Sequence, residues 1–296
     1  MNELSYMQLG GTLFIPASHK RLESVVCEGK YPELRSVVID FEDALDESDF
    51  DSAMFKIDLI LKRITKSRLF IFIRAKNCEH LKELLTLQNI TNINGFVLAK
   101  FSLLNAETYL DLLEDTKYLI MPSIEGNELF NHQKLHELKE IIITNRDKVL
   151  LVRFGLEDML RLLRMRRGCD MSIFDISATA TVIGNFIATF KSAGFGVSGG
   201  VYPCHTDKEG FIKDAKRDMK EGLFTKTIIH PSQIAIINEL YKVDKDEYEE
   251  AVEILNSKKK VFSINGKMAE SLTMSSHSQE LTVRAEIYGV NNEKNI

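Results

Sequence analysis

Two carboxylates in this sequence each stand shortly after an apolar run. Glu125 follows run 118–123 in the segment Met-Pro-Ser-Ile-Glu-Gly, and Asp158 follows run 149–154 in the segment Arg-Phe-Gly-Leu-Glu-Asp. The runs read as consecutive buried strands of a strand–helix series, and residues just past the strand ends of such a barrel face one mouth. Carboxylate oxygens are the ligands of hard cations such as Mg²⁺. The two acids therefore predict a metal-assisted enzyme.

Charged side chains also end other apolar runs. Asp40, Glu42 and Asp43 lie in an acidic turn that either caps the next helix or orders water, a metal or a basic partner at the mouth. Arg74 ends a run of hydrophobic residues, and a buried guanidinium needs a fixed anion. That anion is either an acid of the turn or, as we favour, a substrate carboxylate held by two hydrogen bonds. Lys100 is either a Schiff-base lysine or, as the metal pair favours, a partner of the local acids.

Eight short runs rich in apolar and β-branched residues recur with amphipathic helical segments between them. Nearly all-apolar strands are typical of parallel sheets that helices cover on both faces. The order predicts an α/β fold, a (β/α)₈ TIM barrel over residues 10–243. An open doubly wound sheet is the alternative, but it needs a glycine-rich loop after the first strand, and Phe14–His19 contains no glycine. The eight runs span residues 12–16, 36–41, 69–74, 95–100, 118–123, 149–154, 196–202 and 225–230.

Residues 244–290 are predicted to form a C-terminal helical extension. It begins with a helix over Asp244–Leu255, whose acidic first turn suits the positive end of the helix dipole. A hairpin around Asn265-Gly266 and a polar helix follow. The Asn- and Lys-rich tail 291–296 is predicted to be disordered.

Composition limits the partners. The 296 residues carry a net charge of −5 without a Lys/Arg stripe, which argues against nucleic acid as a partner. No apolar run reaches the roughly 20 residues that span a bilayer, and the N-terminus lacks the pattern of a secretory signal. The four cysteines are scattered, so we expect free thiols. These features predict a cytoplasmic protein with neither a nucleic-acid nor a membrane partner.

Nine motifs occur in the order of a known enzyme family. Each alone is unspecific, but together they run unbroken from residue 12 to residue 270. The sequence resembles a divergent member of the citrate lyase β-subunit and malyl-CoA/citramalyl-CoA lyase family, in the HpcH/HpaI aldolase superfamily. The motifs are Leu13–Pro16, Val38–Asp43, Phe72–Arg74, Val97–Lys100, Ile124–Glu125, Phe154–Asp158, Gly200–Pro203, Ile229–Gln233 and Gly266–Met268.

The resemblance implies a barrel that forms a homotrimer or hexamer, with the C-terminal extension packed on a neighbouring subunit. It also implies Mg²⁺-dependent cleavage or formation of a carbon–carbon bond next to a carbonyl. The substrate would be a hydroxy acid or 2-keto acid, in some members a CoA thioester. By position, Glu125 and Asp158 are the expected Mg²⁺ ligands, and Arg74 holds the substrate carboxylate. Glu42 and Asp43 are expected to hold ordered water at the metal.

The same resemblance implies further site residues. Glu270 stands where the family carries an Asp supplied by a neighbouring subunit, and we expect it to donate or accept a proton. Substrate contacts are expected, besides Arg74, from Phe14, Arg21, Lys100 and Tyr202.

The chain departs from the family pattern in several places. Glu270 is one methylene longer than the usual Asp, and Ala17, Gly199 and Ala99 replace a Gly, an Asp and a Pro. The first-strand loop also lacks the usual pattern of CoA contacts. Two alternatives to a CoA-dependent lyase therefore stay open. One is a non-CoA class II-type aldolase or a thioester hydrolase on the same barrel. The other is a barrel without catalysis that serves as a binding or assembly subunit.

Overall fold

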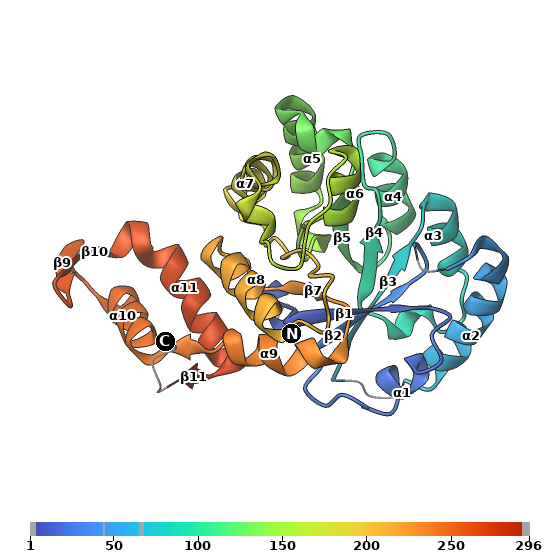
Figure 1. Cartoon of the computed structure of the whole chain (residues 1–296), viewed down its shortest axis with the longest axis horizontal. Helices are drawn as coiled ribbons and strands as arrows, with labels where there is room; N and C mark the ends of the chain where they lie inside the picture. The colour runs from blue at the N-terminus through green and yellow to red at the C-terminus, as the bar shows by residue number, and fades with distance from the viewer. Residues whose placement is uncertain (1–3, 44, 65–67, 292–296) are drawn as a thin grey trace. The chain divides into compact units, whose positions relative to one another are not determined.

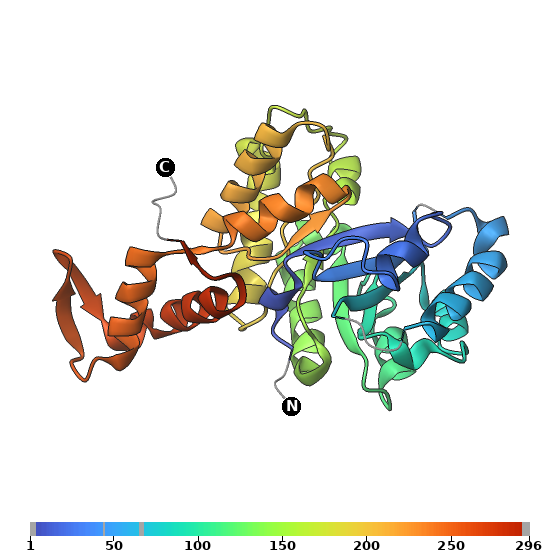
Figure 2. The same ribbon diagram turned by 90° about the horizontal axis from the view of Figure 1, so that it is seen from below.

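The computed structural model describes residues 4–43, 45–64 and 68–291. The chain divides into two compact units, Met1–Ile234 and Ala235–Ile296. Figures 1 and 2 show the first unit in blue through orange and the second in orange through red. Within the described ranges, no helix combines the length and the apolar character that crossing a bilayer requires.

A curled parallel sheet forms the centre of the first unit (Figure 1). Among the described residues it has seven strands in the order β6-β5-β4-β3-β2-β1-β7, so that each strand up to β6 lies beside the one before it in the sequence. The strands are β1 Gly11–Pro16, β2 Ser36–Asp40, β3 Phe70–Ala75, β4 Gly95–Leu98, β5 Leu119–Ile124, β6 Arg153–Phe154 and β7 Lys226–Ile228. Their side chains are nearly all buried, as the apolar runs predict.

The ring between β6 and β7 is closed by single bridges instead of by an eighth full strand. Val197 bridges to Val152 and Gly199 bridges to Lys226, both in parallel. The amide of Gly199 donates to the Thr225 carbonyl over 2.7 Å. The prediction of a TIM barrel is confirmed, but the expectation that 196–202 forms a regular strand is wrong. Its glycines weaken a strand, and the ring of Tyr6 packs so closely that a Cβ on Gly196 would lie 2.6 Å from it.

Amphipathic helices surround the sheet. In α2, for example, Ala53, Ile57 and Leu61 recur at helical spacing and are buried. The helices are α1 Leu22–Val26, α2 Phe50–Lys62, α3 Cys78–Leu84, α4 Ala106–Leu113, α5 His132–Thr144, α6 Leu156–Leu162, α7 Ser177–Lys191 and α8 Lys208–Lys220. Short 3-10 helices lie at Tyr6–Leu9, Glu47–Asp49, Ile90–Asn92, Asn127–Phe130, Arg146–Lys148, Ile173–Asp175 and Pro231–Gln233.

The second unit is a small α/β extension. It contains α9 Ile234–Leu240, whose first residue ends the first unit, then β8 Val243–Asp244, α10 Lys245–Asn256, β9 Val261–Ile264, β10 Lys267–Glu270, α11 Ser271–Tyr288 and β11 Val290–Asn291. Asp244 caps α10 by accepting from the amides of Asp246 and Glu247. Asn265 and Gly266 have φ values of 50° and 77°, as a tight hairpin turn between antiparallel strands requires.

The predicted helix corresponds to α10, and the predicted hairpin corresponds to the β9–β10 pair. Of the tail predicted to be disordered, Asn291 pairs with Asp244 in a two-stranded sheet. Residues 292–296 lie outside the described residues.

Candidate active site

A cavity of about 380 Å³ lies at the carboxyl ends of the barrel strands. Every strand of the barrel contributes to its wall, and so do the loop after β6 and the residues that follow the closing bridges. The wall consists of Phe14, Pro16, Asp40, Asp43, Arg74, Val97, Ser123, Glu125, Arg153, Phe154, Gly155, Leu156, Glu157, Asp158, Gly200, Val201, Thr227 and Ile229. The barrel geometry thus brings together residues that are more than 200 positions apart in the sequence.

Arg74 meets its anion within the protein. It pairs in register with Asp40 on the neighbouring strand, and its Nε and Nη2 donate to the two oxygens of Asp40 over 2.7 Å and 2.6 Å. Nη1 lies 2.7 Å from an oxygen of Glu42, and Nη2 lies 3.6 Å from an oxygen of Asp43. Burial alone would lower the pKa of Arg74, but these carboxylates outweigh it and raise the pKa. Of the two anions expected for Arg74, the structure contains the acid of the turn.

Glu42 also forms an ion pair with Lys100. Glu42 is 4% exposed, and its second oxygen lies 2.9 Å from Nζ of Lys100. Burial lowers the pKa of Lys100, but the hydrogen bond and charge of Glu42 prevail and raise it. A raised pKa keeps the amine protonated, whereas a Schiff-base lysine must lose its proton. Of the two expectations for Lys100, its contacts therefore fit the partner of the local acids and not the Schiff-base lysine.

Glu125 is a buried carboxylate without a full set of partners. It is 5% exposed, and its Oε2 has no hydrogen-bond partner in the described structure. Burial, followed by the negative charge of Glu42, raises the pKa of Glu125 to about 7, and the charge of Asp158 contributes in the same direction. Gly155 makes room for this side chain, since a Cβ there would lie 2.2 Å from Cγ of Glu125. A cation beside Oε2 would stabilise the ionised carboxylate and so offset the cost of burying its charge.

Asp158 lies in the first turn of α6, where the helix dipole favours a negative charge. Its side chain is 22% exposed and accepts from Nη2 of Arg161 over 2.8 Å. Glu125 and Asp158 both line the cavity, as their strand-end positions predict.

The pair of carboxylates fits a magnesium ion. In the described part of the chain, no three or more His, Cys, Asp or Glu side chains gather as a metal cluster. Mg²⁺ does not need such a cluster, because it is commonly held by one or two carboxylates with waters and substrate oxygens in the remaining positions. The buried Oε2 of Glu125, facing the same cavity as Asp158, is the donor such a site requires.

The remaining predicted residues lie in different places. Phe14 lines the cavity, and Arg21 lines a second cavity of about 370 Å³ that shares Phe14, Pro16 and Ile229 with the first. Tyr202 is 1% exposed and is absent from both walls. Glu270 ends β10 in the second unit, where its Oε2 accepts from the hydroxyl of Thr273 over 3.0 Å.

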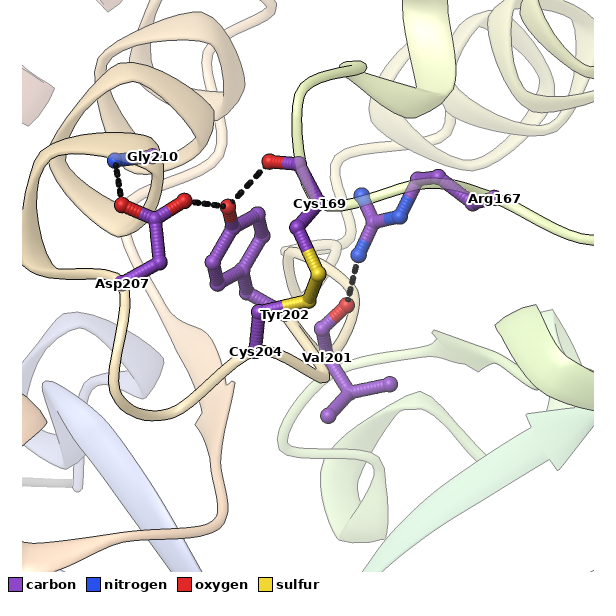
Figure 3. The surroundings of a disulfide bond; sticks show 7 residues. All are labelled: Arg167, Cys169, Val201, Tyr202, Cys204, Asp207 and Gly210. Carbon is purple, nitrogen blue, oxygen red and sulfur yellow. Dashed lines mark hydrogen bonds between the residues drawn. A yellow bond between two sulfur atoms is a disulfide. The ribbon is translucent and has the colours of Figure 1, made fainter.

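Figure 3 shows what holds the loop that carries Val201, a wall residue of the cavity. Nη2 of Arg167 donates to the Val201 carbonyl over 2.6 Å. The hydroxyl of Tyr202 contacts Asp207, which also accepts from the amide of Gly210. The same hydroxyl contacts the carbonyl of Cys169. Tyr202 thus supports the wall of the cavity from behind.

A disulfide joins Cys169 and Cys204 across this loop (Figure 3). The expectation of free thiols is therefore wrong for these two residues. They are 35 positions apart in the sequence, but the loops that carry them bring their Cα atoms to 5.8 Å. Cys27 and Cys78 are free.

Sequence reasoning missed two buried cations on the barrel strands. Lys226 in β7 is fully buried; its Nζ contacts Asp214 and Asp218 and donates to the Gly200 carbonyl over 3.0 Å. Arg153 in β6 is 4% exposed and lines the cavity. The signal was the same for both: a basic residue inside an apolar run, which is costly to bury without a reason.

Comparisons with known proteins agree with the barrel. The chain is 23% identical over 274 residues to the citrate lyase subunit beta of Haemophilus influenzae, covering 88% of this chain and 91% of that protein. The structure of CitE from Mycobacterium tuberculosis in complex with magnesium, acetoacetate and coenzyme A superposes with a TM-score of 0.69 at 18% identity, covering 95% of this chain and 99% of that chain. A citrate lyase from Burkholderia xenovorans gives a TM-score of 0.73 at 15% identity, covering 98% and 97%.

The family model described as C-C_Bond_Lyase of the TIM-Barrel fold matches residues 3–290, nearly the whole chain. The order of motifs, the closed barrel and this match lead to one conclusion: the chain belongs to the family of carbon–carbon bond lyases with a TIM-barrel fold.

Proposed function

We propose that this chain is a Mg²⁺-dependent lyase that cleaves the carbon–carbon bond next to the carbonyl or hydroxyl group of a keto acid or hydroxy acid. The observation that carries the proposal is the buried, incompletely bonded carboxylate of Glu125, which shares the cavity with Asp158. Burial and the charge of Glu42 make the ionised form of Glu125 costly, and a bound cation would offset that cost by stabilising the carboxylate.

Glu125 and Asp158 would hold the ion, which when bound polarises a substrate oxygen and stabilises the negative charge that develops during cleavage. Arg74 stays cationic beside Asp40 and Glu42 and lines the same cavity, so it would offset part of the negative charge at the reacting end of the substrate. The apolar wall residues Phe14, Phe154 and Leu156 exclude water from the reacting bond.

Two features support an extended substrate such as a CoA thioester. The second cavity adjoins the first through Phe14, Pro16 and Ile229 and contains the basic side chains of His19 and Arg21. The M. tuberculosis CitE structure contains coenzyme A together with magnesium and acetoacetate. The departures in the first-strand loop keep a free-acid aldolase as the second candidate.

The proposal includes a homo-oligomer in which Glu270 of one copy serves the cavity of another. Mixed oligomers test this directly. Glu125→Gln and Glu270→Gln chains, each inactive alone, would regain part of the activity after they are unfolded and refolded together. No recovery in verified mixed oligomers would contradict a role for Glu270 across subunits.

The direct test of the reaction is a mass-spectrometric cleavage assay. Malyl-CoA, citramalyl-CoA, their free acids and simple 4-hydroxy-2-keto acids would be incubated with the protein and either Mg²⁺ or EDTA. Mg²⁺-dependent release of acetyl-CoA with glyoxylate or pyruvate supports the thioester lyase, and cleavage of free acids alone supports the aldolase. Product formation that EDTA leaves unchanged would contradict the proposal.

A further inference from the structure

Arg153 is a buried cation that faces the cavity without an anion. The residue is 4% exposed and belongs to the cavity wall. Nη2 donates to the Thr227 hydroxyl over 2.8 Å, and Nη1 lies 3.7 Å from the sulfur of Met121. Neither neighbour is charged, and no Asp or Glu of the described residues forms an ion pair with Arg153. Burial, then repulsion from Arg74, lowers the pKa of Arg153 to about 9.

Arg74 makes the contrast clear. Three carboxylates surround Arg74, and Asp40 occupies its Nε/Nη2 edge, one of the edges through which a guanidinium binds a carboxylate bidentately. Phe14 lies between the two arginines, 5.3 Å from the guanidinium carbon of Arg74 and 5.1 Å from that of Arg153. Both guanidinium groups therefore lie against the ring of Phe14, but only that of Arg74 has carboxylate partners.

The position of Arg153 relative to Glu125 follows from the register of the sheet. Arg153 pairs with Ser123 on the neighbouring strand β5, and Glu125 comes two residues after Ser123, just past the end of that strand. Two residues correspond to about 7 Å along a strand and to the same face of the sheet. Arg153 thus lies one layer deeper in the barrel than Glu125, and a small acid bound at the mouth extends its far end toward it.

We propose that Arg153 binds a carboxylate at the far end of the substrate, separate from the oxygens that face Glu125 and Asp158, so that the substrate acid is a dianion. The inference deepens the proposed function and rests on it for the location of the reacting end. Arg153 is then the residue that selects acids with a second anionic group.

The experiment measures binding without turnover. Isothermal titration calorimetry with Mg²⁺ present would compare two pairs of probes that differ by one carboxylate, L-malate with L-lactate and 2-ketoglutarate with 2-ketobutyrate. The proteins would be wild type, Arg153→Met and, as a matched control, Arg217→Met, which removes a half-exposed arginine bonded to Glu221. Affinity for Mn²⁺, measured by electron paramagnetic resonance, and circular dichroism would be recorded for each.

Wild type and Arg217→Met are expected to bind each dianion at least tenfold more tightly than its monoanion. Arg153→Met is expected to lose roughly 30-fold or more in dianion affinity, the usual effect of removing one partner of a buried charge pair. Its monoanion and Mn²⁺ affinities would stay within about twofold of wild type. If Arg153→Met does not fold, Arg153→Gln, which keeps a polar contact to Thr227, carries the same expectation.

Equal affinity of wild type for dianion and monoanion, or dianion affinity unchanged in the folded Arg153 variant, would overturn the inference. The result is separable from the proposed function. Dianion binding that depends on Arg153, together with no product in the cleavage assay, supports the subsite and contradicts the reaction. Mg²⁺-dependent cleavage of monoanions alone supports the reaction and contradicts the subsite.

Discussion

Glu125→Gln tests the electrostatics of the site through stability alone. Glutamine keeps the size of the side chain but cannot ionise. The folded protein raises the pKa of Glu125 from 4.5 to about 7, so it binds this proton more tightly than the unfolded chain does. The resulting stabilisation is complete below pH 4.5 and is lost as the pH rises through 7.

The size of the effect follows from the shift. At 1.36 kcal/mol per pKa unit, ionising Glu125 in the folded state costs about 3 kcal/mol. Wild type without metal should therefore lose about 2.5 kcal/mol of unfolding free energy between pH 5 and pH 8 relative to Glu125→Gln. The difference between the two proteins removes the contribution of all other titrating groups.

Urea unfolding followed by circular dichroism in EDTA at pH 5, 6, 7 and 8 measures this difference. Adding Mg²⁺ at pH 8 should restore much of the lost stability in wild type and none in Glu125→Gln, because the ion stabilises only the folded protein that binds it. A difference that stays within about 0.5 kcal/mol across the range would refute the argument that burial makes ionisation of Glu125 costly.

Four further outcomes follow from the same geometry. Mg²⁺ affinity should rise with pH between 6 and 8, measured by calorimetry, because the proton on Glu125 competes with the ion; a flat profile contradicts this. Asp158→Asn should weaken Mg²⁺ binding at least tenfold while the melting temperature without metal stays nearly unchanged. Gly155→Ala should cost about 1–3 kcal/mol in urea unfolding, since its Cβ would overlap Glu125, whereas Gly184→Ala, in open space, should not. Cys169→Ser should lower stability by about 2–4 kcal/mol under oxidising conditions and have little effect after reduction with dithiothreitol.

The sequence was informative where the barrel itself positions a residue. Glu125 and Asp158 line the cavity because consecutive parallel strands deliver their ends to one mouth, which apolar runs reveal without a structure. Their assignment as metal ligands stays a prediction. The acidic turn next to Arg74 was recognised too, but the choice of Asp40 as its bidentate partner depends on the register of β2 and β3, which composition does not encode.

Other contacts join residues that lie on different elements and meet only when those elements pack together. The two carboxylates beside Lys226 come from Asp214 and Asp218, one helical turn apart on α8, so the compensation of the buried lysine is visible only after α8 packs on the barrel. The disulfide joins loops that carry no recognisable cysteine spacing. Arg153 was the one charged residue of its apolar run, but the cavity that it lines is visible only in the structure.

The most direct test of the central claim is to locate the metal. Crystals grown with Mn²⁺ and a keto acid would be measured near the manganese absorption edge, where anomalous scattering identifies the ion. The account predicts one strong peak within coordination distance of a carboxylate oxygen of Glu125 and of Asp158, with substrate oxygens completing the shell. A fully active protein whose Mn²⁺ lies elsewhere, leaving Oε2 of Glu125 uncoordinated, would contradict it.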